Sequence, residues 1–294
     1  MHQEVQLSQD GRITLYPDYN IRVSSQPNIY GEKFVLRLMK KEQTISGLEE
    51  LGYPDEETVM ETCFNKRNCI AVIAAPTGEG KTTTLYSALS LLNKPEVNIT
   101  TVEDPVEIRI PGLNQIEINK RVSFADSLRT ILRQDPDIIL VGEMRDLDTI
   151  RLALTAAETG HLVFGTLHTS SASQTVDRII DVFPEGQQQQ IRVQLGGTLE
   201  AVFSQTLLPK TVNGVKKGRV MAQEILVKNN AVSNMIREGK SAQLYSAIQT
   251  GAGQGMQTLE TALSELYKHK LITEEDALAK SQRPEEFRRL AGIN

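Results

Sequence analysis

The chain has 294 residues, with 32 basic and 37 acidic side chains and a formal net charge of −5 at pH 7. Its 39% of hydrophobic and 23% of charged residues are ordinary globular values, which excludes wholesale disorder, and the mild acidity argues against a protein that coats nucleic acid or membrane. The two cysteines, Cys63 and Cys69, are too few for a disulfide scaffold or a four-cysteine zinc site, so we expect reduced thiols in a cytoplasmic protein.

The first 43 residues are expected to form part of a small β unit. Short strand-like runs occupy residues 12–16, 21–25 and 34–39, separated by turns that contain proline, asparagine and glycine. A segment of about forty residues is too short to bury a core alone. It therefore either docks on the rest of the chain or belongs to a larger domain. We expect a linker at 44–58 and a second domain at 59–294.

From residue 59 onward, strand-like apolar runs alternate with helical patterns. Strands are expected at residues 70–75, 97–102, 137–141 and 162–167, and helices from residue 81 and at 123–133, 148–158 and 172–183. Ser123 and Thr273 have the spacing of helix N-caps. The alternation predicts an α/β fold in which helices cover a mainly parallel sheet. From about residue 229 the patterns are almost all helical, so a helical C-terminal region is expected.

The most informative stretch is residues 75–83, Ala-Pro-Thr-Gly-Glu-Gly-Lys-Thr-Thr, which has Walker A spacing except that Ala75 holds the first glycine position. An apolar strand precedes it and a helical pattern follows, which argues against a chance glycine-rich turn. Glycines let backbone N–H groups face phosphate oxygens, and the helix N-terminus adds partial positive charge. Lys81 is spaced to reach the β- and γ-phosphates of ATP, and Thr82 to bind Mg²⁺. If its position requires a positive φ, Ala75 costs on the order of 1 kcal/mol. The residues expected to contact the nucleotide here are Pro76, Thr77, Gly78, Glu79, Gly80, Lys81, Thr82 and Thr83.

A second signal of a nucleotide site lies further along the chain. Residues 138–141, Ile-Ile-Leu-Val, read as a buried strand that ends at Gly142 and Glu143. Open α/β sheets bind ligands at the carboxyl ends of their strands. There Glu143 could orient or deprotonate the attacking water, or hold Mg²⁺. A glutamate after a strand is more often a solvated loop residue, but the phosphate loop favours the functional interpretation.

Further motifs give the chain a family resemblance. Residues 101–107, Thr-Val-Glu-Asp-Pro-Val-Glu, resemble the Asp box of the secretion and type IV pilus ATPases. Residues 135–146 resemble their Walker B region, and residues 165–169, Gly-Thr-Leu-His-Thr, resemble their His box. With the phosphate loop, all four motifs occur in the family's order, and the resemblance covers nearly the whole chain. It implies a RecA-like P-loop core in a homohexameric ring that hydrolyses ATP with Mg²⁺.

Within this family, two stretches resemble the pilus-retraction branch: residues 172–184 and 231–238. The four-cysteine metal loop of the extension and secretion branches is absent from the sequence, so no zinc is expected. Residues 9–12 and 29–37 are more similar to the extension and secretion branches. The first half of the family's N-terminal domain has no counterpart in this sequence, so the small β unit is expected to be truncated. The resemblance favours type IV pilus retraction and twitching motility, with pilus extension or type II secretion as the alternative.

The resemblance also implies roles for individual acids. Glu143 corresponds to the family's catalytic carboxylate, and Glu103 and Glu107 correspond to acids on the Mg²⁺ and water side of the site. Mg²⁺ would bind Thr82, Glu103 and Glu143, although several carboxylates also repel one another. The sequence leaves open which Asp-box acid faces the metal. His168 is either a structural residue at a strand end or, as the resemblance favours, a contact of the γ-phosphate or of a glutamate.

Five arginines match family positions, three of them (Arg129, Arg133 and Arg145) near the nucleotide or the subunit interface and the other two near the nucleotide. Arg22 and Arg37 would reach it from the N-terminal unit, where a guanidinium can stabilise charge that develops during phosphoryl transfer. Arg129 and Arg133 are spaced i, i+4 on one expected helix face, and Arg145 follows Glu143 closely. The alternative for all five is a solvated surface.

These expectations combine into a hypothesis of a cytoplasmic hexameric motor. It would act at the inner face of the inner membrane through a pilus platform protein, and nucleotide-dependent closure of the N-terminal unit on the core would produce force. A nucleic-acid translocase on the same core is disfavoured by the acidic balance, so no nucleic acid is expected as a partner. A nucleotide-gated scaffold with negligible hydrolysis is disfavoured by Glu143 together with Lys81 and Thr82, although Ala75 leaves room for it.

Overall fold

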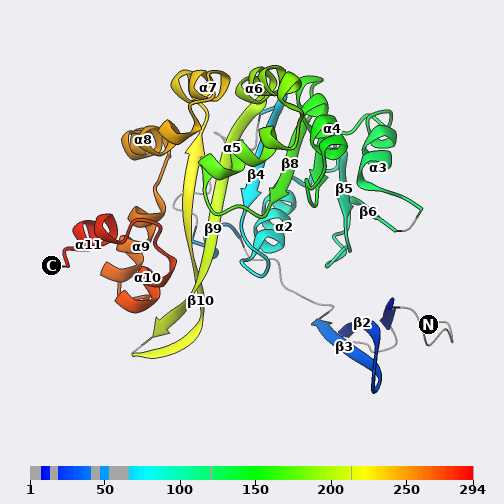
Figure 1. Cartoon of the computed structure of the whole chain (residues 1–294), viewed down its shortest axis with the longest axis horizontal. Coiled ribbons are helices and arrows are strands. Elements are labelled where there is room, and N and C mark those ends of the chain that lie inside the picture. Colours follow the sequence, from blue (N-terminus) through cyan, green and yellow to red (C-terminus); the bar gives the residue numbers. More distant parts are fainter. Residues whose placement is uncertain are drawn as a thin grey trace. The chain divides into compact units, whose positions relative to one another are not determined.

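The computed structural model describes residues 8–13, 19–40, 47–52, 66–119, 121–212 and 214–293. It divides into two compact units (Figure 1). The first comprises the described residues of Met1–Ile45 together with Val106–Ile110, and the second those of Ser46–Pro105 and Pro111–Asn294. Most of the expected linker, and Cys63, lie outside the described residues. The division into 1–43, 44–58 and 59–294 therefore stays a prediction.

The first unit contains an antiparallel sheet of three strands in the order β1-β2-β3: β1 Gln9–Ile13, β2 Tyr19–Asn28 and β3 Gly31–Lys40. The sequence predicted all three, although part of the first expected run lies outside the described residues. Gly31, with φ of +128°, opens β3 after a tight turn in which Asn28 Oδ1 accepts the N–H of Tyr30 at 2.8 Å. In the register of β2 and β3, Arg22 stands directly opposite Arg37.

The second unit is built on a seven-stranded sheet in the order β10-β9-β4-β8-β7-β5-β6. The strands are β4 Cys69–Ala74, β5 Ile99–Glu103, β6 Asn114–Glu117, β7 Ile138–Val141, β8 Leu162–Leu167, β9 Leu199–Val212 and β10 Val215–Val227. All neighbouring pairs are parallel except β9 with β10. Every residue of β4, β5, β7 and β8 is buried, as expected for strands covered on both faces. The predicted α/β fold is confirmed.

Helices follow the strands of this sheet and then form the C-terminal region (Figure 1). They are α2 Lys81–Leu92, α3 Phe124–Ile131, α4 Leu147–Glu158, α5 Ala172–Asp181, α6 Glu185–Thr198, α7 Asn230–Arg237, α8 Leu244–Thr250, α9 Leu259–Lys268, α10 Glu274–Lys280 and α11 Pro284–Ala291. The predicted caps are confirmed, because Ser123 accepts the N–H of Asp126 and Thr273 that of Asp276. No helix of the described residues is long and apolar enough to cross a membrane.

One expected helix end needs correction, and strand β6 was not predicted. The helix expected at 123–133 ends at Ile131, so Arg133 lies beyond it and does not share a helix face with Arg129. The N–H of Arg133 bonds the carbonyl of Thr130, three residues back, which marks the tightened end of the helix. The long hairpin of β9 and β10 was also not predicted.

This hairpin joins the sheet to the C-terminal helices, as Figure 1 shows. The buried side chains of Leu208 on β9 and Ala222 on β10 pack with Leu263 of α9 and Phe287 of α11. Tyr267 meets Phe287 edge to face, with ring centroids 6.0 Å apart. The C-terminal helices are thus fixed to the strand that neighbours β4, and this position brings α10 to the phosphate loop.

Candidate functional site

The phosphate loop connects the end of β4 to the start of α2. Gly78 and Gly80 have φ of +85° and +87°, values that favour glycine, and Gly80 is the N-cap of α2. Lys81, Thr82 and Thr83 form the first turn of the helix, while Pro76 and Thr77 are exposed at the start of the loop. The loop therefore presents the helix N-terminus in the manner that suits phosphate.

Ala75 fits its position without strain. Its side chain is buried, and its N–H continues the ladder of β4 and β8 by donating to the carbonyl of Leu167 at 3.1 Å. In the described part of the chain the non-glycine residues with positive φ are Asn68, Asp135 and Lys270. Ala75 is not among them, so the free-energy cost considered for an alanine at positive φ does not apply.

Lys81 connects the loop to the end of β8. Its Nζ donates to the carbonyl oxygens of Ala75 at 2.6 Å and Pro76 at 3.2 Å, and lies 3.2 Å from Nδ1 of His168. Burial lowers the pKa of Lys81, against the opposing charges of Glu143 and Glu79. Because an ammonium group only donates, Nδ1 of His168 accepts and the ring proton sits on Nε2. That Nε2 lies 3.1 Å from Oε1 of Glu143.

Two glycines explain how Glu143 reaches this position. A Cβ on Gly142 would lie 2.8 Å from the carbonyl oxygen of Val102, so the chain after β7 passes too close to β5 for any side chain. A Cβ on Gly165 of β8 would lie 2.8 Å from Sδ of Met144. The N–H of Met144 donates to the carbonyl of Thr166 at 3.1 Å. Glu143 is thereby held between the ends of β5, β7 and β8.

The carboxylate of Glu143 is charged at neutral pH. Burial would raise its pKa, but the hydrogen bond and charge of Arg145, together with His168, outweigh burial and lower it. Both partners contact Oε1: Arg145 through an ion pair and His168 at 3.1 Å. A half-buried carboxylate with a low pKa is suited to orienting water or binding a cation rather than to holding a proton.

Glu103, the second predicted acid, ends β5 in a closed environment. The hydroxyl of Tyr86 on α2 donates to Oε2, while Thr101 Oγ1 at 2.5 Å and Gln115 Nε2 at 3.3 Å donate to Oε1. The residue is 5% exposed. Its carboxylate is therefore already engaged with α2 and the neighbouring strands, and its role at a metal stays a prediction.

The remaining predicted residues lie on other elements. Arg22, Arg37 and Glu107 belong to the first unit. Arg129 pairs with Asp126 at 2.9 Å and lies 3.9 Å from Asp148 at the start of α4. The structure thus brings together four of the predicted residues, namely Lys81, Glu143, Arg145 and His168.

The donor set fits ATP with Mg²⁺. Mg²⁺ prefers oxygen ligands and usually combines one or two carboxylates with water and substrate phosphates. Thr82 and Glu143 supply a hydroxyl and a carboxylate. The described residues contain no cluster of three or more histidine, cysteine or acidic side chains that could hold a metal alone. A magnesium ion here would therefore depend on the bound phosphates.

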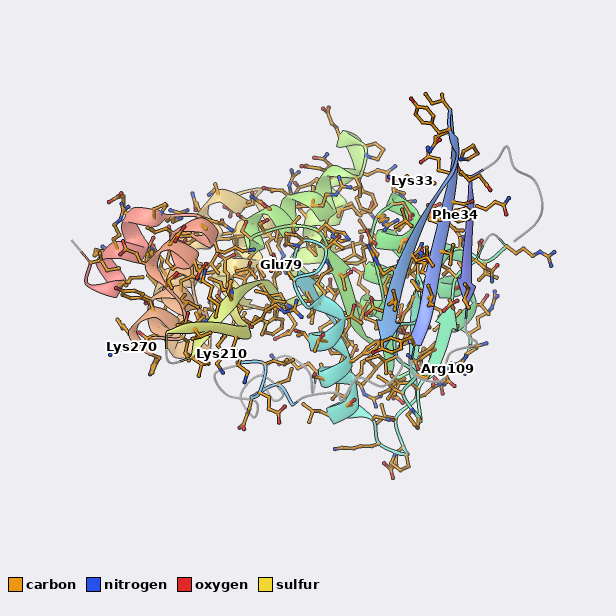
Figure 2. The ribbon with its side chains drawn as sticks, turned by 90° about the horizontal axis from the view of Figure 1, so that it is seen from below. Lys33, Phe34, Glu79, Arg109, Lys210 and Lys270 are labelled. Carbon is orange, nitrogen blue, oxygen red and sulfur yellow. The ribbon has the colours of Figure 1, made fainter. Side chains whose placement is uncertain are left out.

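The residues of β9 and α10 that hold the phosphate loop were not predicted from the sequence. Glu79, labelled in Figure 2 near the N-terminal end of α2, contacts Leu207 and Thr206 of β9 and Lys280 of α10. Along the chain, Thr206, Leu207 and Lys280 lie 127, 128 and 201 residues after Glu79. No local motif signals such contacts, and β9 itself was not predicted.

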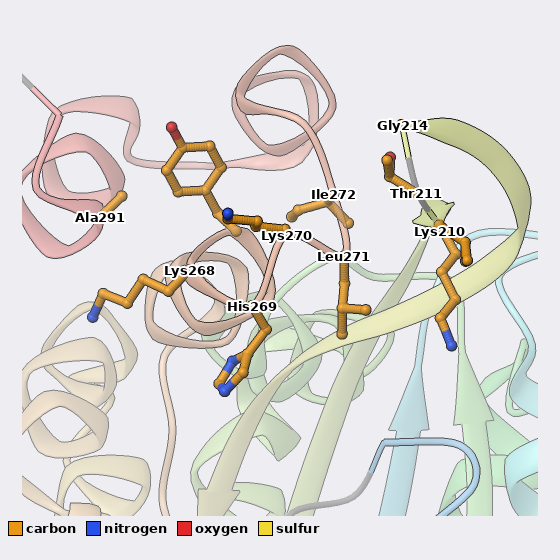
Figure 3. A pocket seen from close by; sticks show the side chains of 11 residues that line it. Lys210, Thr211, Gly214, Lys268, His269, Lys270, Leu271, Ile272 and Ala291 are labelled. Atoms are coloured by element: carbon orange, nitrogen blue, oxygen red, sulfur yellow. The ribbon is translucent and has the colours of Figure 1, made fainter.

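A cavity of about 910 Å³ lies elsewhere, between the hairpin and the turn that joins α9 to α10. Its lining includes Lys210, Lys268 and Lys270. In Figure 3 the side chains of Lys210 and Lys268 point in different directions, so the ammonium groups do not converge on a common anion. None of the predicted site residues lines it.

Comparison with known proteins identifies the family. Residues 2–286 match the family model described as type II/IV secretion system protein. The chain belongs to this family. The resemblance drawn from the four sequence motifs is confirmed.

Relatives of the chain include a pilus retraction ATPase and a twitching motility protein. The chain is 48% identical to the type IV pilus retraction ATPase PilT of Pseudomonas aeruginosa, over 82% of this chain and 70% of that protein. It is 46% identical to a twitching motility protein of Neisseria gonorrhoeae, over 82% of this chain and 65% of that protein. A crystal structure of the pilus retraction motor PilT with bound ADP superimposes with a TM-score of 0.84 at 39% identity, covering 98% of this chain and 83% of that chain.

Proposed function

We propose that this protein is a Mg²⁺-dependent ATPase that drives type IV pilus retraction. The observation that carries the proposal is the chain of contacts from Lys81 through His168 to Glu143, built at the ends of β4, β8 and β7 beside the N-terminus of α2. Similarity to a pilus retraction ATPase and to a twitching motility protein, each along 82% of the chain, supports retraction as the biological role.

In the proposed reaction Lys81 exchanges its backbone acceptors, Ala75 and Pro76, for the β- and γ-phosphate oxygens of ATP. Backbone N–H groups of the loop and the first turn of α2 bind the same phosphates. Thr82 would hold Mg²⁺ directly and Glu143 would hold it through water, and the ion would supply positive charge against the β- and γ-phosphate oxygens. Glu103 and Glu107 would place further negative charge on the side of the site where Mg²⁺ and the water bind.

Glu143 orients the attacking water. His168 and Arg145 both address Oε1 in the described structure, so we assign Oε2 to the water. As the water oxygen bonds to the γ-phosphorus, the bond from that phosphorus to the leaving oxygen of ADP breaks, and the proton of the water passes by way of Oε2 to the departing phosphate. His168 fixes the direction of the carboxylate and, through Nδ1, links it to Lys81. When bound phosphate draws Lys81 away from His168, this link would transmit the change to Glu143.

Two arginines of the first unit are proposed to bind the γ-phosphate. Arg22 and Arg37 lie directly opposite in the β2–β3 register, and both are exposed. Like charges in opposite positions of a sheet repel each other. An anion between them would remove this repulsion, so the pair is suited to a phosphate that arrives and leaves with each cycle.

The proposal extends to assembly and partners. A homohexamer would place Arg129 and Arg133 at or near a subunit interface. The ring would act on a platform protein at the cytoplasmic face of the inner membrane. Pilus extension or secretion is the second candidate, favoured by the resemblance of residues 9–12 and 29–37 to those branches.

Mg²⁺-dependent ATPase activity measured across a size-exclusion profile tests the proposal. We expect activity in a hexamer peak, loss of that activity in Glu143→Gln, and no stimulation by DNA or RNA. Activity confined to monomer, or untouched by the substitution, would contradict the assigned assembly or carboxylate. Complementation of a strain that lacks its retraction ATPase distinguishes the branches: restored twitching supports retraction, and failure with intact ATPase activity favours extension or secretion.

A further inference from the structure

We propose that Lys280 is a positioning residue for nucleotide binding, because its ammonium group neutralises and holds Glu79, a carboxylate inside the phosphate loop. The inference rests on the proposed nucleotide site. It assigns a role in that site to the C-terminal helices, since Lys280 is the last residue of α10.

Glu79 stands in an electrostatically unfavourable place. It lies between the two glycines of positive φ and only two residues before Lys81. A negative side chain here repels the phosphates that the loop is built to bind, and the repulsion grows with the charge of the nucleotide. Burial would raise the pKa of Glu79, but hydrogen bonds from Lys280 and Leu207 outweigh burial and lower it, so the group stays ionised.

The side chain of Glu79 is turned toward β9 and α10. Oε1 accepts from Nζ of Lys280 at 2.7 Å. Oε2 accepts the backbone N–H of Leu207 and the hydroxyl of Thr206, the latter at 3.2 Å. The exposed fraction is 16% for the Glu79 side chain and 36% for that of Lys280. An ion pair this shielded is screened less by salt than an exposed pair.

Gln205 of β9 adds a further tie between the loop and the sheet. Its Nε2 donates to the backbone carbonyl of Glu79 at 2.7 Å, and its Oε1 accepts from the hydroxyl of Thr84 on α2 at 2.9 Å. A Cβ on Gly80 would lie 3.2 Å from the same Nε2. The conformation of the loop is therefore set by three consecutive residues of β9 and by Lys280.

The segment after α10 also contacts the loop that follows His168. Nε2 of Gln282 donates to the carbonyl of Ser170, two residues beyond His168, at 2.6 Å. The N–H groups of Gln282 and Arg283 donate to Oε1 of Glu260 at 3.1 and 2.9 Å, which fixes this segment on α9. Lys280 therefore projects from a fixed base and is not a free surface lysine.

The test is a titration of the full chain with fluorescent ATP and ADP analogues. We expect Lys280→Met, which keeps the aliphatic stem and removes the charge, to weaken binding of the ATP analogue about fivefold and that of the ADP analogue less. The loss should shrink at high salt. Adding Glu79→Gln in the same chain should restore affinity to within about twofold, because the repelling charge is then gone.

Lys216→Met is the matched control. Lys216 also pairs with an acid of α10, Asp276, at 2.8 Å, but it lies on β10, outside the residues that hold the phosphate loop. Its loss should leave both affinities unchanged. Equal weakening in Lys280→Met and in the double variant would overturn the inference, since a merely structural contact is not rescued by removing the carboxylate. Unchanged binding in Lys280→Met would also overturn it. Absence of binding by the wild-type chain would instead overturn the proposed function.

Discussion

Nε2 of His168 lies 3.1 Å from Oε1 of Glu143, between the carboxyl ends of β8 and β7. Nζ of Lys81 lies beside the other ring nitrogen, Nδ1, and an ammonium group can only donate a hydrogen bond to it. These partners assign the Nε2–H tautomer to His168, which makes the histidine a donor to the carboxylate. The histidine is thereby an orienting group for Glu143 rather than a base.

Replacing His168 by alanine is expected to lower kcat about 10- to 100-fold while leaving ADP affinity near that of the wild type, because the water-orienting carboxylate loses its fixed direction. Steady-state ATPase assays with a parallel ADP titration check this. A rise in KM at unchanged kcat would contradict the orienting role and point to direct phosphate binding instead.

The glycines on either side of Glu143 give a matched pair of variants. In Gly142→Ala the new methyl group meets backbone, the carbonyl of Val102 at 2.8 Å, so the main chain that carries Glu143 must move. In Gly165→Ala it meets the far end of the flexible Met144 side chain, which can rotate away. We expect kcat to fall about tenfold or more in Gly142→Ala and to stay within about threefold in Gly165→Ala. Similar losses in both would show that backbone position is not the deciding factor.

Glu103 can be tested as a structural acid or a metal ligand. Glu103→Ala removes the acceptor for the buried hydroxyls of Tyr86 and Thr101, and unsatisfied groups of this kind should lower the free energy of unfolding by about 3 kcal/mol. Urea denaturation measures the loss. Glu103→Gln keeps one acceptor oxygen and should lose less. Unchanged stability together with a higher Mg²⁺ requirement would favour the metal role.

The parallel strands β4, β5, β7 and β8 could be predicted because each has a recognisable local sequence pattern. β4, β7 and β8 are buried along their whole length, and a continuous apolar run between turn residues is visible without any knowledge of the neighbours. The hairpin is different. β9 and β10 are buried where they join the sheet and exposed toward the tip, so neither a continuous apolar run nor a regular alternation marks them throughout.

The candidate site likewise contains residues that could be predicted from the sequence and residues that could not. The phosphate loop and Glu143 were predictable because each is a strand end followed by a short motif. The pairing of Glu79 with Lys280 was not, since a lysine at the end of a helix reads as a favourable partner of that helix's own C-terminus. The placement of Arg133 failed for a smaller reason, because α3 ends two residues early and helix ends are the least certain part of a sequence pattern.

Glu224 connects β10 to the segment after His168. Its Oε1 accepts the N–H of Ala172 at the start of α5 at 2.7 Å, and the residue is 3% exposed. Burial, together with the charge of Glu260, raises the pKa of Glu224 to about 7, although the bond from Ala172 and the charge of Arg283 oppose this.

The raised pKa makes stability depend on pH in a defined direction. The folded state holds the Glu224 proton up to about pH 7, while the unfolded chain releases it near its ordinary value of 4.5. Between these values the folded state binds more protons, so its stability is complete below pH 4.5 and falls as pH rises through about 7. Glu224→Gln removes the titration. Its free energy of unfolding relative to wild type should therefore increase by about 3 kcal/mol between acidic and mildly alkaline pH. Urea denaturation at both pH values, with the exposed Glu185→Gln as control, measures this. A difference between variant and wild type that does not change with pH would mean that Glu224 is ionised in the folded protein throughout.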